Sequence, residues 1–112
     1  MAVIYADGSS NVINGTSGDD IIIVDIEGSF TINALDGNDL IILTAGSGHA
    51  VRAGRGNDVV QYLSTDTSNG VSQLRGEDGD DTFVIDGSFA QLYGGAGVDS
   101  SLSRNLHIPW SG

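Results

Sequence analysis

A short turn containing glycine and aspartate recurs five times along this chain and limits what it can fold into. The turns align on Asp20, Asp39, Asp58, Asp81 and Asp99, at intervals of 19, 19, 23 and 18 residues, and a glycine stands two positions before each aspartate. A unit of about 20 residues is too small to bury an apolar face by itself, so it must stack on its neighbours. The period therefore predicts a solenoid of stacked coils.

Composition supports one acidic domain. We expect a single domain over residues 1–112, with repeats over about 12–102 and a C-terminal cap over about 102–112. Fifteen acidic side chains against four arginines give a net charge of −11, which argues against nucleic acid and anionic membranes as partners and in favour of cations. The 39% apolar content supplies a core and argues against disorder.

Other sequence features exclude several classes of protein. Cysteine is absent, so the chain has neither disulfides nor thiolate metal sites. No stretch approaches the roughly 18 apolar residues that span a bilayer, so we expect no membrane span. The N-terminal MAVIYADGSS has neither a basic region nor a long apolar run, so we expect no cleaved export signal.

Each coil is predicted to contain two short strands, one after and one before its Gly-Asp turn. β-Branched residues in short runs bounded by Gly, Asp, Asn and Ser favour strands, and we expect almost no helix. The first strands are predicted at 20–25, 39–44, 58–63, 81–86 and 99–104, and the second at 11–14, 30–33, 50–53, 72–75 and 90–93. The fold class is therefore all-β, a parallel β-roll or β-helix solenoid of about five coils.

Alternate residues of a strand face the same side, which identifies the core. Four extra residues between Asp58 and Asp81 fall within 64–70, in a variable row of turns opposite the Gly-Asp row, where they should bulge without breaking the stack. The last coil should be capped by Leu102, Leu106, Ile108 and Trp110, with Pro109 ending strand pairing. The inward columns are predicted to be Ile22, Val24, Ile41, Leu43, Val60, Tyr62, Phe83 and Ile85 in the first sheet and Ile13, Ile32, Val51, Leu74 and Leu92 in the second.

The aligned aspartates create an electrostatic problem that a cation would solve. Stacked parallel strands lie about 4.8 Å apart, so the aspartates form a column of like charges at that spacing. Each adjacent pair costs on the order of 1 kcal/mol even at the dielectric constant of water. Calcium suits these turns best, because it accepts about 6 to 8 oxygen ligands in flexible geometry, whereas magnesium demands a stricter octahedron and zinc prefers nitrogen or sulfur. The sequence therefore predicts several bound calcium ions.

The turns resemble the calcium-binding nonapeptide G-G-x-G-x-D-x-U-x of the repeats-in-toxin (RTX, or hemolysin-type) family, where U is a large apolar residue. The last copy matches Gly94, Gly95, Gly97 and Asp99 but has Ser101 at U, while the other four keep U and relax the first two glycines. The resemblance implies a right-handed parallel β-roll with calcium held between neighbouring turns by carboxylates and loop carbonyls. Only one row of turns carries the motif, which is similar to the one-sided RTX-like rolls of a bacterial adhesin.

The candidate metal-binding residues follow from this motif. The aligned aspartates supply carboxylates, and the glycines two positions earlier allow φ > 0, which turns backbone carbonyls toward an ion. Further acids in the turns, Asp36 and Asp78 together with Asp19 and Asp80, are expected chiefly to raise the local field. The candidate set is Asp20, Asp39, Asp58, Asp81, Asp99, Gly18, Gly37, Gly56, Gly79, Gly97, Asp36 and Asp78.

Two outer faces are candidates for partners. The outward positions Ile21, Ile23, Leu40, Ile42, Val59 and Val84 of the first sheet are apolar, and a monomer seldom leaves such a patch bare. The C-terminal segment could cover it, or it could form a homodimer or larger assembly. The second sheet presents Asn14, Asn33, Arg52, Arg75 and Tyr93, which we interpret as a solvated face, although the two arginines could receive an acidic ligand.

The sequence gives little support to catalysis. His49 in a variable turn and His107 in the tail have no spaced partner that would suggest a triad or a zinc site, and we expect both at the surface. The leading hypothesis is a non-enzymatic module whose folding depends on calcium, acting as a scaffold in an exported bacterial protein, as the resemblance implies. The alternative is an adhesive or ligand-binding module for carbohydrate or ice, with structural calcium. The positions that would template ice are charged and irregular, which disfavours ice.

Overall fold

The computed structural model describes residues 2–8, 10–63, 72–85, 90–95, 97, 100–103 and 110–111. Within these residues every regular element is a β-strand and no helix occurs, as the sequence predicts. The predicted site residue Asp99, the second histidine His107, the insertion 64–70 and the predicted cap residues Leu106 and Ile108 lie outside the described residues, as do the side chains of residues 100–103 and 110–111.

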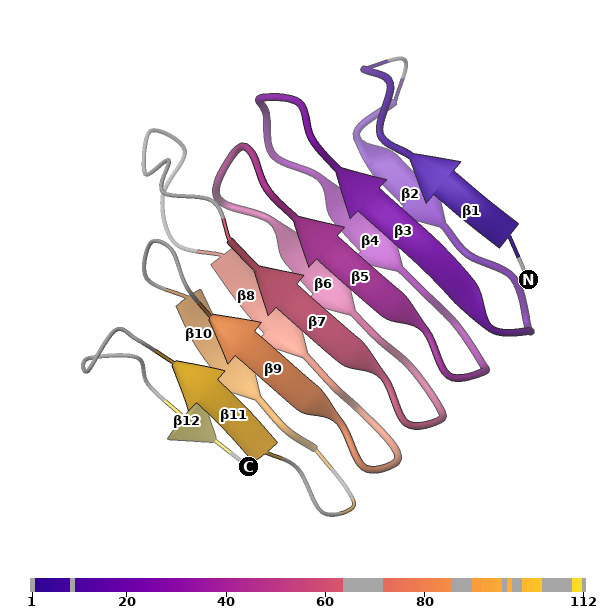
Figure 1. The fold of residues 1–112 in the computed structure, drawn as a ribbon, viewed down its shortest axis with the longest axis vertical. Coiled ribbons are helices and arrows are strands. Elements are labelled where there is room, and N and C mark those ends of the chain that lie inside the picture. The colour runs from indigo at the N-terminus through magenta and orange to yellow at the C-terminus, as the bar shows by residue number, and fades with distance from the viewer. Residues whose placement is uncertain are drawn as a thin grey trace.

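The strands form two parallel sheets in which neighbours come from successive coils (Figure 1). Every strand pair is parallel, which the repeat requires because each coil runs in the same direction as the one before. The first sheet contains, in order, β1 (Ala2–Tyr5), β3 (Asp20–Val24), β5 (Leu40–Leu43), β7 (Val59–Tyr62), β9 (Thr82–Ile85) and β11 (Ser100–Ser103). The second contains β2 (Val12–Asn14), β4 (Thr31–Asn33), β6 (Ala50–Arg52), β8 (Ser72–Arg75), β10 (Ala90–Tyr93) and β12 (Trp110–Ser111).

The chain winds as a right-handed solenoid. In Figure 1 it runs along the front sheet, crosses at the variable edge, returns along the rear sheet and comes forward again through a Gly-Asp turn, one coil further along. This is the hand that parallel crossover connections almost always take. The structure thus confirms the predicted fold class, a right-handed parallel β-solenoid.

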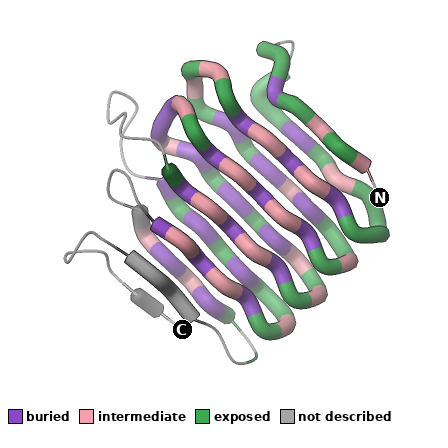
Figure 2. Tube along the Cα trace, in the orientation of Figure 1, coloured by how far each residue is buried: buried purple, intermediate pink, exposed green. Residues whose placement is uncertain are grey.

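The core consists of the predicted inward columns. Ile22 pairs with Ile41, Ile41 with Val60, and Val60 with Phe83, and all four are fully buried. Figure 2 shows the result as an alternation of buried and partly exposed residues along the strands of the first sheet. Register is fixed because a slip of one residue would turn this column out to solvent. The thirteen predicted core residues are all buried, since the second-sheet residues and Val24, Leu43, Tyr62 and Ile85 are no more than 7% exposed.

Both ends of the solenoid differ from expectation. Strand β1 pairs with β3 from Ala2 to Tyr5, so the first sheet begins before the first Gly-Asp turn. The expectation that Pro109 ends strand pairing is wrong, because Trp110 pairs with Leu92 and adds β12 to the second sheet. These two strands extend the sheets to six strands each, and the number of coils differs slightly from the five expected.

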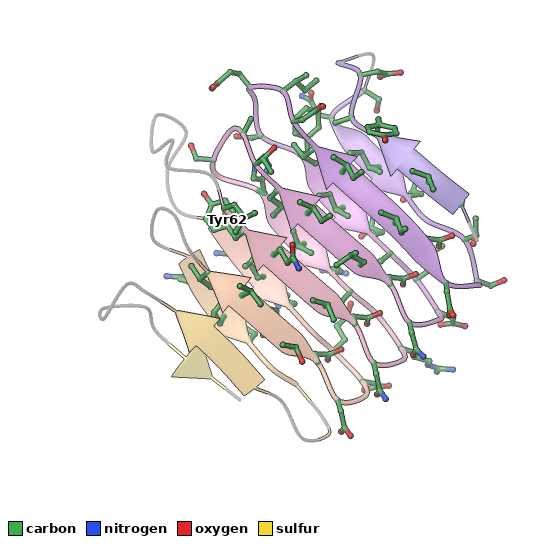
Figure 3. The ribbon with its side chains drawn as sticks, in the orientation of Figure 1. Tyr62 is labelled. Atoms are coloured by element: carbon green, nitrogen blue, oxygen red, sulfur yellow. The ribbon has the colours of Figure 1, made fainter. Side chains whose placement is uncertain are left out.

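The expectation that His49 lies at the surface is also wrong, because it is only 1% exposed. The backbone N–H of Phe30 donates to its Nδ1 at 3.1 Å, so the proton sits on Nε2, which lies 3.0 Å from the carbonyl of Ala45. Its ring stacks on Phe30 at 5.8 Å and meets the edge of Tyr62, labelled in Figure 3, at 6.3 Å. The imidazole thus satisfies two backbone groups at this edge of the core.

Candidate metal centre along the Gly-Asp turns

Four of the aligned aspartates form a buried column along one edge of the solenoid. Asp20 opens β3, and the other three directly precede β5, β7 and β9. Each side chain points inward, and each residue is only 1–2% exposed. The aspartate column, as we call Asp20, Asp39, Asp58 and Asp81, therefore lies at the margin of the core and not on the outer surface of the turns.

One oxygen of each carboxylate ties its coil to the coil before. The backbone N–H of Asp20 donates to Oδ1 of Asp39 at 2.8 Å, and that of Asp39 donates to Oδ1 of Asp58 at 2.8 Å. Asp58 N–H donates in the same way to Oδ1 of Asp81, at 3.0 Å. The repeated aspartate thus links neighbouring coils at each of the four described turns, whether or not a cation is bound.

The second carboxylate oxygen is left without a hydrogen bond in the middle of the column. Oδ2 of Asp39 and Oδ2 of Asp58 are buried, and neither has a hydrogen-bond partner. A buried carboxylate oxygen that lacks a donor has lost its hydration without compensation, which costs free energy of folding. Proteins normally compensate with a hydrogen-bond donor, a proton or a metal ion.

Burial and like charge act together on these two groups. Burial is the main cause that raises the pKa of Asp39 to about 6, and the nearby carboxylates of Asp20 and Asp19 add to it. Burial likewise raises the pKa of Asp58 to about 8, with the carboxylates of Asp81 and Asp39 as further causes. The middle of the column therefore favours a proton or a cation over free negative charge.

The first turn is built differently, and Asp20 has all the donors it needs. Thr16 donates its backbone N–H to Oδ2 at 2.7 Å and its hydroxyl to Oδ1 at 2.8 Å, while Ala2 N–H donates to Oδ1 at 3.1 Å. Burial pushes the pKa of Asp20 upward, but these hydrogen bonds outweigh it and the pKa is lowered. Asp20 therefore ends the column without needing a cation, although its motif looks like the others.

The glycines two positions before the aspartates hold the turns in contact. Gly37, Gly56, Gly79 and Gly97 have φ of 101°, 109°, 104° and 100°, as the sequence predicts, but Gly18 does not have a positive φ. A Cβ on Gly56 would lie 2.7 Å from the carbonyl carbon of Gly37 and closer still to its oxygen. The same close approach recurs at Gly37, Gly79 and Gly97, so the backbones of successive turns touch directly.

Sequence reasoning missed a second ladder on the exposed side of the same turns. Asp19 accepts the backbone N–H of Asn38 at 2.8 Å, Asn38 accepts that of Asn57 at 2.8 Å, and Asn57 accepts that of Asp80 at 2.8 Å. In this ladder each side chain accepts a hydrogen bond from the coil that follows it, whereas each carboxylate of the aspartate column accepts one from the coil that precedes it. The signal was available in the sequence, because the residue before each of the first four aligned aspartates is always Asp or Asn.

Two predicted ligands are not brought to the column. Asp36 and Asp78 are exposed on the side of the turns that faces the second sheet, where Asp78 lies 3.9 Å from Nε of Arg55. The structure thus separates these two acids from the buried carboxylates. Both acids line a surface groove on that side of the solenoid.

The donor set of the column suits an oxygen-seeking cation. At the Asp81 turn, the point that a Cβ on Gly76 would occupy lies 2.7 Å from the carbonyl oxygen of Gly94 and closer still to Oδ2 of Asp81, so carboxylate and carbonyl oxygens converge there. In the turns of Asp39 and Asp58 the matching position holds the buried methyl groups of Ala34 and Ala53. Among the described residues, no three acidic or histidine side chains form a metal-binding group, so an ion would need backbone carbonyls as well. Calcium is the common cation that accepts such a set.

Comparison with protein-family models, curated proteins and solved structures gave no match to this chain. In the described part of the chain, no helix is long and apolar enough to cross a membrane.

Proposed function

We propose that this chain is a calcium-binding module whose folding is coupled to cation uptake along the aspartate column. The observation that carries the proposal is the pair of buried, unpartnered Oδ2 atoms of Asp39 and Asp58. Asp39, Asp58 and Asp81 would supply carboxylate oxygen, and backbone carbonyls of the turns would supply the rest. A bound Ca²⁺ would supply positive charge that replaces the repulsion between stacked carboxylates with attraction.

The site exists only when the coils are stacked, so binding and folding must be linked. The carboxylates of successive turns are 19 to 23 residues apart in sequence and meet only in the folded solenoid. A ligand that binds only the folded state stabilises it by about 2.7 kcal/mol at a concentration 100 times its Kd. The free energy of metal binding would therefore appear as free energy of folding.

Calcium removal is the first test. At about pH 9, above the raised pKa values of both Asp39 and Asp58, we expect excess calcium to raise the unfolding free energy by about 2.7 kcal/mol or more for each occupied site. Thermal and urea unfolding followed by far-ultraviolet circular dichroism, with calcium or with excess chelator, would measure the change. Magnesium at equal concentration should give a smaller shift, because it accepts irregular oxygen sites poorly. Unchanged strand content and unfolding midpoint after chelation would overturn the proposal.

The substitution Asp58→Asn separates the column from general charge effects. The amide keeps an acceptor for the N–H of Asp39 but removes the charged oxygen, so the calcium response should shrink markedly. Asp36→Asn removes the same charge from an exposed turn position outside the column and should leave the response intact. An equal loss in both variants would mean that calcium acts only by screening the net charge of −11.

The proposed role is that of a non-enzymatic scaffold in an exported bacterial protein. A module of this kind would stay loosely folded where calcium is scarce and become a rigid rod in calcium-rich extracellular surroundings. The resemblance of the turns to RTX repeats and the acidic surface support this placement.

We also propose that the outer face of the first sheet associates with a second copy. Tyr5 is 59% and Val3 54% exposed there, and among the described residues no charge interrupts the face, although the protein carries 15 acidic residues. Apolar sheet faces of this kind pack face to face about 10 Å apart. The described outward residues are Val3, Tyr5, Ile21, Ile23, Leu40, Ile42, Val59, Gln61, Thr82 and Val84.

Sedimentation would test this association. We expect a monomer–dimer equilibrium in calcium whose midpoint lies at micromolar protein, roughly −8 kcal/mol. Ile42→Lys places a charge at the centre of the face and should shift the protein to monomer, whereas Thr31→Lys on the outer face of the second sheet should not. A strictly monomeric protein at all concentrations, or equal effects of both variants, would contradict the proposal.

A further inference from the structure

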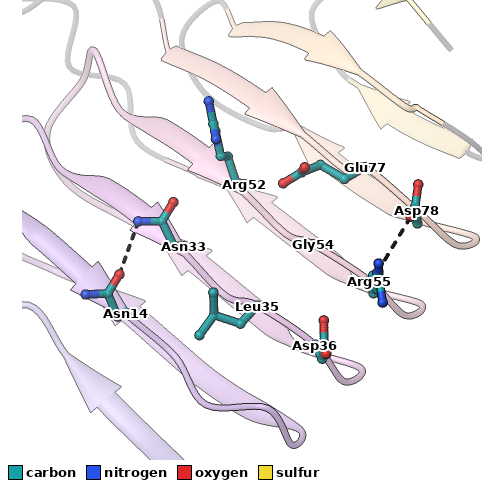
Figure 4. Close-up of a pocket in the computed structure, with 9 residues that line it drawn as sticks. All are labelled: Asn14, Asn33, Leu35, Asp36, Arg52, Gly54, Arg55, Glu77 and Asp78. Carbon is teal, nitrogen blue, oxygen red and sulfur yellow. Dashed lines mark hydrogen bonds and ion pairs between the residues drawn. The ribbon is translucent and has the colours of Figure 1, made fainter.

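A groove of about 470 Å³ lies along the outer side of the second sheet, where its strands lead into the Gly-Asp turns (Figure 4). It is separate from the aspartate column, and nothing in the calcium proposal uses it. Strand ends contribute Asn14, Asn33 and Arg52, and turns contribute Leu35 and Glu77 among others. The groove therefore spans several coils and can exist only when they are stacked.

The groove is hollow because one coil lacks a side chain at a position where its neighbours carry one. Gly54 forms the floor, and the equivalent residues of the flanking coils, Leu35 and Glu77, form walls on either side (Figure 4). A Cβ on Gly54 would collide with the backbone of Leu35, so the floor admits only glycine. An apolar wall and an acidic wall thus face each other across bare backbone.

Both walls are held in a backbone conformation that favours glycine. Leu35 has φ of 68° and Glu77 has φ of 66°, and they are the only residues other than glycine with positive φ among those described. The equivalent Gly54 and Gly95 adopt similar φ values of 85° and 81° without a side chain. Such strain in ordinary residues is concentrated at functional sites. The folded chain thus keeps Leu35 and Glu77 in a strained backbone conformation that glycine would adopt without strain.

The polar groups of the groove are unevenly paired. Arg55 lies 3.9 Å from Asp78, but Arg52 has no hydrogen-bond or ion-pair partner among the described residues. The amide of Asn33 donates to Oδ1 of Asn14 at 3.1 Å, which aligns the two amides along the groove. A free guanidinium therefore stands at one end of a hollow whose wall carries a free carboxylate, that of Glu77.

We propose that this groove binds a neutral oligosaccharide. Arg52 can only donate hydrogen bonds, Glu77 can only accept them, and the asparagine amides do both, so a suitable ligand must offer donors and acceptors side by side. Hydroxyl groups do so, and the C–H face of a sugar ring fits against the Leu35 side chain, which is 47% exposed. An anionic ligand would meet Glu77, Asp36 and a net charge of −11, whereas a cationic ligand would meet Arg52.

Amide chemical shifts of the calcium-loaded protein would test the proposal. The probes are neutral tetrasaccharides of glucose (cellotetraose and maltotetraose), mannose and N-acetylglucosamine, with tetragalacturonate and spermidine as charged comparisons. We expect at least one neutral probe to shift the amides of Leu35, Gly54 and Glu77 with a Kd on the order of 1 mM, unchanged by added salt. No such shifts up to about 10 mM, or shifts with a charged probe only, would overturn the proposal.

The variant Leu35→Gly separates binding from folding. Glycine relieves the positive φ, so the unfolding midpoint should stay the same or rise, while loss of the apolar wall should weaken binding at least about tenfold. Val12→Ala is the matched control, because Val12 is 49% exposed on the same sheet but does not line the groove. Unchanged affinity in Leu35→Gly, or an equal loss in Val12→Ala, would contradict the assignment. Neither outcome depends on the calcium sites, whose occupancy the unfolding experiment reports separately.

Discussion

Replacing Gly56 with alanine is expected to destabilise the solenoid by about 3–5 kcal/mol, enough to unfold a domain of ordinary stability. Gly56 has φ of 109°, where an L-residue is strained. The added methyl group would also lie 2.7 Å from the carbonyl carbon of Gly37, and this backbone cannot move without separating two coils. Both the backbone strain and the collision come from the one added methyl group.

Gly18→Ala is the matched control for that experiment. Gly18 occupies the same motif position, but its φ is not positive, and the nearest atom to an added Cβ is Oγ1 of Thr16 at 3.8 Å. We expect this variant to change the unfolding free energy by less than about 0.5 kcal/mol. Urea unfolding of both variants in calcium measures the difference. Similar effects in the two variants would show that the turns do not pack as the structure describes.

The calcium-free protein is expected to lose several kcal/mol of stability as the pH rises from about 4 to about 8. The pKa of Asp58 is raised to about 8 and that of Asp39 to about 6 in the folded state, against about 3.9 for an unfolded aspartate. Between the unfolded and folded values the native state holds protons that the unfolded state has lost, so stability falls as the pH rises. Each unit of difference corresponds to about 1.4 kcal/mol.

The direction of this effect is the opposite of the usual one for a salt-bridged carboxylate. A carboxylate with a lowered pKa, such as Asp20, contributes stability that is lost as the pH falls through its folded value, so it works against the trend at the acidic end. Well below about pH 4 Asp39 and Asp58 are protonated in both states, so the contribution of this raised pair is fully present. Well above about pH 8 both are ionised in both states, and the whole penalty applies unless a cation neutralises the column.

Urea unfolding in chelator at intervals from pH 4 to pH 9 would measure the slope. Asp58→Asn should flatten it, because the amide stays neutral throughout, and Asp36→Asn should keep it, because this side chain lies outside the column. Excess calcium should reduce the slope in the unmodified protein by taking the place of the protons. A stability that rises steadily from pH 4 to pH 8 in chelator would contradict the assigned environment of Asp58.

Much of the fold could be predicted because the same pattern of strand and turn residues recurs several times along the chain. The alternation in DIIIVD and DLIILT gives the inward positions Ile22 and Ile41 directly, and the constant spacing gives parallel pairing. The two ends of the solenoid were harder to predict. Strand β1 precedes the first motif, and β12 follows a proline, so neither has a copy of the repeat to mark it. Pairing there depends on the edge that the neighbouring coil offers, not on local residues.

The candidate site could be predicted in its residue types but not in its detail. The sequence identifies the aligned aspartates, yet only the fold shows that one oxygen serves the backbone of the adjacent coil and that the other is left free at Asp39 and Asp58. The motif of Asp20 looks the same as the others, and the neighbouring Thr16 makes the difference. His49 is buried because Phe30 and Tyr62 surround it, and each comes from a different coil.

The sequence by itself determined the period, the strands of the repeats, the inward columns and the single row of Gly-Asp turns. Side-chain alternation and turn chemistry are local properties, and the same pattern recurs in each repeat. Tertiary structure alone decided which carboxylate oxygens are buried without a hydrogen-bond partner, where the stack continues past its last motif, and that Gly54 leaves a groove between Leu35 and Glu77. Those properties arise between residues 18 to 23 positions apart. Burial, strand register and the side chains of the next coil determine these properties. A motif that is nearly the same in every coil cannot encode differences between coils.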